Sequence, residues 1–272
     1  MNALTVDVED WFHVCGLARE PVVAPAAWRL RVNVDKLMTL LAEQQVRATF
    51  FVLGWVAENV PGLVRQIALA GHEIASHGYS HRLVVQLDPP RFRDEIRRTG
   101  DILERQSGTR PVGYRAPQWS LSLETPWPFD ILYEEGYRYD SSCTPLHFIG
   151  NPRGRRTPYR LKTAAGSLWE IPPMVTPSLL GNLPTGGGWG LRLFPRRVIE
   201  NTIRDLNAAG TPAVIFLHPR DFDPAGPRLE LSPLRSFAAY GPRTDVTQRL
   251  AHLLRRFRFG TLRTLVEQWE SA

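Results

Sequence analysis

The chain is poor in cysteine and lysine and contains no long apolar run. Cys15 and Cys143 are the only cysteines among its 272 residues, so we expect two ordinary reduced thiols and no disulfide framework. No stretch reaches the ~18 consecutive apolar residues of a membrane span. The first ten residues, MNALTVDVED, lack the basic and apolar regions of a secretory signal. The sequence therefore predicts a cytoplasmic protein without a transmembrane segment.

Lysine is nearly absent, so the positive charge comes almost entirely from arginine. Lys36 and Lys162 are the only lysines, and the formal net charge is +6. Most arginines alternate with apolar residues at helical spacing, which is typical of solvated helix faces. The segment NPRGRRTPYR (151–160) differs. It is either an ordinary polar loop or a surface for an anionic partner such as a phosphate or a membrane. No nucleic-acid motif is present, so we expect no nucleic-acid partner.

Strand-like and helix-like segments alternate along the chain, which favours parallel βαβ units in an α/β fold. No Gly-rich phosphate loop follows the first strand, which disfavours a nucleotide-binding sheet. A (β/α) barrel and an open doubly wound sheet remain as alternatives. Residues 33–45 are a predicted helix with Asn33 as its N-cap. Residues 143–195 are rich in Pro, Gly and Arg and interrupt the alternation, so we predict a long functional insertion in a single domain.

Polar side chains follow the predicted strands, where the active sites of (β/α) barrels lie. Any one of them alone is more typical of a structural ion pair or a buried histidine. Their joint occurrence at successive strand ends indicates a functional site. These residues are Asp7, Glu9, Asp10, His77, His81, Arg115, Asp140 and His218.

His77 and His81 have the H-x-x-x-H spacing, which on a helical turn places both imidazoles on one face. The alternative is a pair of surface or capping histidines. Two histidines and one carboxylate, with water at the remaining positions, form a common open metal site for hydrolysis. A second carboxylate is then needed as a general base toward a water whose pKa falls to about 7. The segment from Asp7 to Asp10 contains three acids, enough for both roles.

Three further residues have candidate roles beside the metal. His218 could act as a general acid toward the leaving group, or it could be a buried structural histidine. Arg115 could orient the base carboxylate through a fork-like contact. Asp140 could orient His218 and raise its basicity.

The motifs TVDVED, SHGYSH, YRAPQW, YRYDSS and FLHP occur in the order and approximate spacing of the polysaccharide deacetylase family, carbohydrate esterase family 4. The similarity covers about residues 1–222. The GGGW segment and a C-terminal GTL resemble the branch found in exopolysaccharide loci with exosortase systems. The resemblance implies a distorted (β/α) barrel of seven strands, with residues 223–272 as a C-terminal helical extension packed on the same domain.

The same resemblance implies a hydrolase that removes the acetyl group from an N-acetylhexosamine unit of an exopolysaccharide or its precursor. It also implies a divalent metal, usually zinc, and an acetylated oligo- or polysaccharide as the partner. Peripheral contact with a membrane-linked glycan is an open possibility. Asp7 would be the general base held by Arg115, and His218 the general acid with Asp140 near it.

The metal ligands implied by the resemblance include His77 and His81. Val8 stands where many family members have a second aspartate, so the carboxylate ligand falls on Glu9, with Asp10 as the alternative. The metal and a backbone N–H near Trp119 would stabilise the oxyanion.

Trp119 and Trp189 are candidate substrate contacts, because sugar faces stack on aromatic rings. The glycines around Trp189 would let its loop approach the ligand or move over it. Two other functions remain open. One is an amidohydrolase or deformylase that acts on a different C–N bond with the same fold. The other is a glycan-binding protein with a degenerate site.

Overall fold

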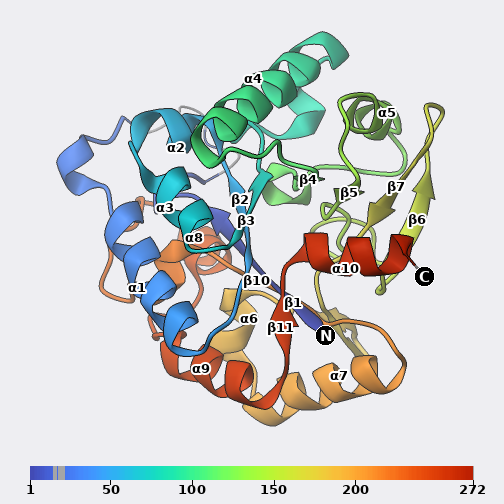
Figure 1. Cartoon of the computed structure of the whole chain (residues 1–272). Helices are drawn as coiled ribbons and strands as arrows, with labels where there is room; N and C mark the ends of the chain where they lie inside the picture. Colours follow the sequence, from blue (N-terminus) through green and yellow to red (C-terminus); the bar gives the residue numbers. More distant parts are fainter. Residues whose placement is uncertain (15–16, 18–21, 272) are drawn as a thin grey trace.

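The computed structural model describes residues 1–14, 17 and 22–271, so Cys15 lies outside the described residues. Its parallel strands form one sheet in the interior, with helices packed around it (Figure 1). The order of the parallel strands is β10 (Val214–Leu217), β1 (Asn2–Val8), β2 (Thr49–Val52), β3 (Glu73–Ser76), β4 (Gly113–Tyr114), β5 (Tyr139–Asp140) and β7 (Ser167–Glu170). β6 (Tyr159–Lys162) pairs antiparallel with β7.

The residues that follow β7 close the sheet into a barrel. The amide of Ile171 donates to the carbonyl of Asp140 in β5 at 2.9 Å, and the amide of Met174 donates to Val214 in β10 at 2.8 Å. The chain thus crosses from one edge of the sheet to the other within a few residues. The predicted distorted (β/α) barrel is confirmed, and the distortion lies at this seam.

The longer helices follow the predicted alternation and bury an apolar stripe. In α4 (Pro89–Ser107), Phe92, Ile96 and Leu103 are buried as the helical spacing predicts. The other helices are α1 (Leu30–Glu43), α2 (Gly54–Asn59), α3 (Leu63–Leu69), α5 (Trp127–Glu134), α6 (Gly188–Leu193), α7 (Arg196–Ala208), α8 (Pro233–Tyr240), α9 (Thr247–Arg256) and α10 (Leu262–Glu270). None of the helices in the described part of the chain combines the length and apolar character of a membrane span.

Residues 143–195 are more than an insertion, because they supply the barrel strand β7 and its neighbour β6. They also contain a separate hairpin of β8 (Thr176–Ser178) and β9 (Gly181–Leu183). The C-terminal part shares the barrel core, since Leu250 and Leu253 of α9 lie in the same buried cluster as Leu4 of β1. β11 (Phe259–Gly260) pairs with the start of β1. The division at residue 222 stays a prediction.

A buried carboxylate joins α10 to the amino ends of the strands. Glu73 accepts hydrogen bonds from the hydroxyls of Thr49 at 2.6 Å and Tyr139 at 2.8 Å. It also accepts the amide of Arg263, in the first turn of α10, at 3.0 Å. A carboxylate at a helix N-terminus satisfies free amides and complements the helix dipole. Glu73 therefore links β2, β3, β5 and α10.

We predict that Glu73→Ala lowers the free energy of unfolding by on the order of 3 kcal/mol, because it leaves buried donors on Thr49, Tyr139 and Arg263 without an acceptor. Urea denaturation followed by circular dichroism measures the change. Glu43→Ala, at the exposed end of α1, is the matched control and should change stability by less than about 0.5 kcal/mol. Equal effects of the two substitutions would contradict the linking role of Glu73.

Candidate active site

The carboxyl ends of four strands bring together most of the predicted site residues. Asp7 and Glu9 lie at the end of β1, and His77 follows β3. Arg115 follows β4, and His218 follows β10. The Nε2 atom of His218 lies 3.1 Å from Oε1 of Glu9 and 3.8 Å from Oδ2 of Asp7. Two carboxylates therefore face one imidazole.

Arg115 fixes the position of Asp7. Its guanidinium is fully buried, and one of its NH groups donates to Oδ1 of Asp7 at 2.7 Å and to the Thr5 hydroxyl at 2.9 Å. The other nitrogens donate to the carbonyl and hydroxyl of Ser141. Because Arg115 holds Oδ1, the second oxygen of Asp7 is the one directed at His218. The predicted contact between Arg115 and Asp7 is present.

Glu9, His77 and His81 form a group whose ligand atoms all lie within 4.8 Å of one another. The Nδ1 atom of His77 donates to the carbonyl of Arg115 at 2.8 Å, so Nε2 carries the free lone pair. Burial lowers the pKa of His77 to about 4, which keeps the ring neutral near pH 7. A neutral imidazole oriented by a backbone carbonyl is the usual form of a metal-binding histidine. This donor set fits a divalent metal.

The two histidines do not lie on a helical turn, contrary to the expectation. The chain after β3 turns sharply, with φ of +76° at Gly78 and +58° at His81. This turn places the two imidazole rings 5.5 Å apart. A non-glycine residue with positive φ is strained, and such strain is common at functional sites.

Glu9 is surrounded by cationic and imidazole groups. Its Oε2 lies 2.5 Å from Nε2 of His81, and its Oε1 accepts from Arg220 at 2.7 Å. Burial would raise the pKa of Glu9, but His81, Arg220 and His218 outweigh it and hold the pKa well below its usual value. Glu9 is therefore a carboxylate at all ordinary pH values.

Asp10 is not part of this group, which removes it as the alternative metal ligand. Its carboxylate accepts the backbone amides of Trp11 at 2.8 Å, Arg29 at 2.9 Å and Leu30 at 3.0 Å. It thus caps the N-terminus of α1 from a distant point in the sequence. The expectation that Asn33 caps this helix is also wrong, since α1 begins at Leu30 and Asn33 lies inside it.

Asp221, and not Asp140, is the carboxylate that faces Nδ1 of His218. Oδ2 of Asp221 lies 3.7 Å from Nδ1 of His218 and accepts the His218 amide at 2.8 Å. Burial and Arg220 lower the pKa of His218, but Glu9 and Asp221 raise it more, so the net shift is upward. Asp140 instead accepts the amide and hydroxyl of Ser142. The expectation that Asp140 orients His218 is corrected, because its side chain is engaged beside its own strand.

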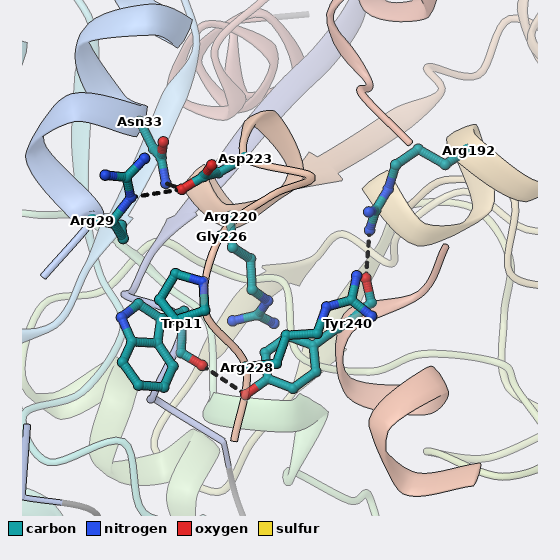
Figure 2. A pocket seen from close by; sticks show the side chains of 10 residues that line it. Trp11, Arg29, Asn33, Arg192, Arg220, Asp223, Gly226, Arg228 and Tyr240 are labelled. Carbon is teal, nitrogen blue, oxygen red and sulfur yellow. Dashed lines mark hydrogen bonds and ion pairs between the residues drawn. The ribbon is translucent and has the colours of Figure 1, made fainter. Parts of the chain in front are cut away.

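The residues that sequence reasoning missed are Arg220 and Asp221, just after His218, and Arg192 of α6. Figure 2 shows Arg220 between Trp11 and Tyr240, at a cavity of about 10 Å³ that holds no more than about one water. Arg192 donates to Asp221 at 2.6 Å, while Arg220 reaches Glu9. The two arginines therefore balance the charges of Asp221 and Glu9, the carboxylates that contact His218. The i, i+3 spacing of His218 and Asp221 was the available sequence signal.

Trp119, the first of the two predicted substrate-contact tryptophans, packs against a neighbour of His218. The ring of Trp119 packs against Phe216, with 4.6 Å between centroids, and Phe216 lies next to His218 at 6.0 Å. The Trp119 amide donates to the carbonyl of Ala116 at 3.2 Å, so this amide is not a free oxyanion donor.

Trp189 is an anchor for α8, which corrects its assignment as a substrate contact. Its indole N–H donates to the carbonyl of Phe237 at 2.9 Å, and its ring packs on Phe237 with 5.3 Å between centroids. Gly188 and Gly190 beside it lie in α6 and provide close packing. A Cβ on Gly188 would lie 2.0 Å from the Asp221 carboxylate, and one on Gly190 would lie 1.9 Å from the Pro184 carbonyl.

Two family models match the chain in succession. The model described as polysaccharide deacetylase matches residues 25–132, and a domain of unknown function, DUF3473, matches residues 141–267. The peptidoglycan deacetylase of Helicobacter pylori is 28% identical over 139 residues, which cover 51% of this chain and 43% of that protein. The peptidoglycan-N-acetylglucosamine deacetylase of Bacillus cereus is 39% identical over 82 residues, covering 30% of each chain. The chain thus spans less than half the length of these curated relatives.

A solved structure extends the similarity over most of the chain. A polysaccharide deacetylase homologue from Mycobacterium smegmatis superposes with a TM-score of 0.61 and 29% sequence identity. The superposition covers 88% of this chain and 77% of that one. It therefore includes the barrel and much of the segment matched by the domain of unknown function. Residues 25–132 of the chain thus match the polysaccharide deacetylase family, and residues 141–267 match DUF3473.

Proposed function

We propose that the chain is a hydrolase that removes the acetyl group from an N-acetylhexosamine unit, with a divalent metal held by Glu9, His77 and His81. The observation that carries the proposal is the arrangement around His218. Asp7 and Glu9 both face this imidazole, and Arg115 holds the opposite oxygen of Asp7. When bound, a zinc ion would acidify a water and polarise the acetyl carbonyl.

The remaining roles belong to side chains of this chain. Asp7 takes a proton from the attacking water, because its Oδ2 is the oxygen that Arg115 leaves free. His218 gives a proton to the departing amine, and the upward shift of its pKa favours the imidazolium that this step needs. Asp221 holds His218 in place through the His218 amide and faces its Nδ1.

The substrate class is supported by the curated relatives, which are named as deacetylases of peptidoglycan and of its N-acetylglucosamine units. We infer an acetylated oligo- or polysaccharide for this chain. An exopolysaccharide or its precursor, presented in the cytoplasm, is the finer proposal. It rests on the motif pattern of the exopolysaccharide-locus branch.

One observation favours a second candidate. Arg220 already neutralises Glu9 at 2.7 Å, so the site holds a fixed cation of its own. This cation would suit an amidohydrolase or deformylase that acts on another C–N bond with less dependence on a metal. A degenerate glycan-binding protein is the remaining alternative. A substrate panel scored for acetate, formate and ring opening separates the first two functions.

Asp7→Asn should lower kcat for acetate release from acetylated chitooligosaccharide by about 10²- to 10⁴-fold, because the base is lost. Bound metal should be retained, since Asp7 lies outside the ligand group. Asp205→Asn, at an exposed position of α7, should leave turnover unchanged. Unaltered turnover in Asp7→Asn, with thermal unfolding showing a folded protein, would remove Asp7 from the mechanism.

His77→Ala should abolish stoichiometric zinc binding, because one of the two histidine ligands is gone. Elemental analysis of zinc-loaded, desalted protein measures the metal directly. His147→Ala, an exposed histidine, is the control and should retain the metal. Wild-type protein that releases acetate without bound metal would contradict the metal assignment.

Asp221→Asn should shift the alkaline limb of the kcat/KM profile to lower pH. The acid form of His218 is required, so activity is full below its pKa and is lost as the pH rises through it. Asp221 helps to raise the pKa of His218, and removing this carboxylate lowers that pKa. Asp223→Asn, whose carboxylate pairs with Arg29 instead, should leave the limb in place. An upward shift or no shift in Asp221→Asn would contradict the assigned role.

A further inference from the structure

Two adjoining loop tips, one at residues 145–150 and one between β8 and β9, carry exposed apolar side chains. Leu179 and Leu180, between β8 and β9, are 106% and 92% exposed, and Phe148 is 71% exposed. The tips touch, since the side-chain amide of Asn182 donates to the carbonyl of Pro145 at 2.7 Å. A Cβ added to Gly181 would lie 2.9 Å from the His147 ring, next to Phe148. The apolar residues therefore belong to one surface.

Folding of the hairpin does not explain the two leucines. The positions between the strands of a tight hairpin favour Gly, Asn or Asp, whose backbone conformations and polar side chains suit a turn. Here both positions are leucine, and the polar bonds of the turn come from the Ser178 hydroxyl, which donates to Gly181 at 2.6 Å. Exposed leucines that replace the preferred turn residues, and that do not pack against the rest of the chain, indicate a binding surface.

A strongly basic segment adjoins the same tips. Arg153, Arg155 and Arg156 are exposed, and residues 141–169 contain no Asp or Glu. Within the described residues, none of the three arginines has an ion pair, and Arg155 only stacks over the Tyr159 ring at 4.9 Å. The arginines of α4 differ, since Arg93 and Arg97 both contact Glu135. The positive charge of the basic segment is therefore not balanced by an ion pair within the described residues, and an anionic partner could bind there.

We propose that this tip surface, made of Phe148, Leu179, Leu180, Arg153, Arg155 and Arg156, docks on an anionic lipid bilayer. Leucine and phenylalanine side chains insert at the boundary between headgroups and acyl chains, and each nearby arginine adds attraction to anionic lipid. An anionic polysaccharide would satisfy the arginines but offers no hydrocarbon for Leu179 and Leu180. In a twofold dimer the same basic patch would meet itself and repel.

Docking of the tip surface on a membrane would favour a membrane-linked substrate for the proposed active site. A cavity of about 200 Å³ is lined by Arg155, Pro145 and Trp119, among other residues. Trp119 packs on Phe216, the neighbour of His218. Arg155 of the tip surface thus shares a cavity with Trp119, whose ring packs beside the neighbour of His218, and this arrangement fits a glycan whose lipid anchor lies in the membrane. This consequence rests on the proposed function, whereas the docking itself does not.

Cosedimentation with vesicles tests the docking without substrate. Wild-type protein should bind vesicles of phosphatidylcholine with phosphatidylglycerol, bind phosphatidylcholine alone at least about tenfold more weakly, and dissociate at high salt. Substituting both leucines, Leu179→Ser/Leu180→Ser, should weaken binding at least about tenfold. The charge variant Arg153→Gln/Arg155→Gln/Arg156→Gln should remove the preference for phosphatidylglycerol.

Matched controls use residues of similar exposure elsewhere. Leu69 and Leu234 are 77% and 80% exposed, and Leu69→Ser/Leu234→Ser should bind vesicles as wild type does. Arg65, Arg196 and Arg197 are exposed outside the tip surface, and changing all three to Gln should have a smaller effect than the tip variant. Leu179→Ser/Leu180→Ser should turn over a soluble acetylated oligosaccharide at the wild-type rate, which separates docking from catalysis.

A positive signal comes from Leu180→Trp, whose fluorescence should be quenched by brominated lipid beyond the wild-type level. Absence of wild-type vesicle binding would overturn the proposal. Equal losses of vesicle binding in the tip variants and the control variants would also overturn it. The same holds if the wild-type protein self-associates without binding vesicles and Leu179→Ser/Leu180→Ser abolishes that self-association. Binding of a soluble anionic polysaccharide in place of vesicles would assign the surface to a glycan and also overturn it.

Discussion

The site depends on the burial of one guanidinium. Arg115 is cut off from water, so each of its N–H groups must find an acceptor inside the protein. The acceptors are Thr5 and Asp7 on β1 and Ser141 after β5. The carbonyl of the same residue accepts the Nδ1 proton of His77. One residue therefore sets the position of a candidate base and the tautomer of a candidate metal ligand.

Charges alternate outward from this centre. Glu9 is contacted by His81, Arg220 and His218, while Asp221 stands between His218 and Arg192. Each buried charge is thus flanked by charges of opposite sign, which is the condition under which ionised groups persist in a protein interior. The same arrangement raises the pKa of His218, whereas burial lowers the pKa of His77 to about 4.

The sequence was most informative where local pattern and strand order decide the outcome. Strand ends placed Asp7, Glu9, His77, Arg115 and His218 at one edge of the sheet, and the structure brings them together. It was least informative where a polar side chain has a choice of partners far away in the chain. Asp10 follows the same strand as Glu9, yet it caps a helix nineteen and twenty residues on. Asp140 and Trp189 also bind local or distant backbone that no sequence spacing specifies.

The seam after β7 has a consequence for how the two matched segments can be separated. The polysaccharide deacetylase match ends at residue 132 and contains β2, β3 and β4, whereas β10 beside β1 and β7 beside β5 come from the later segment. Either segment alone would present long unpaired strand edges. The boundary between the two sequence families is therefore no hinge in the molecule, and the chain cannot be cut or recombined there as if it joined independent modules.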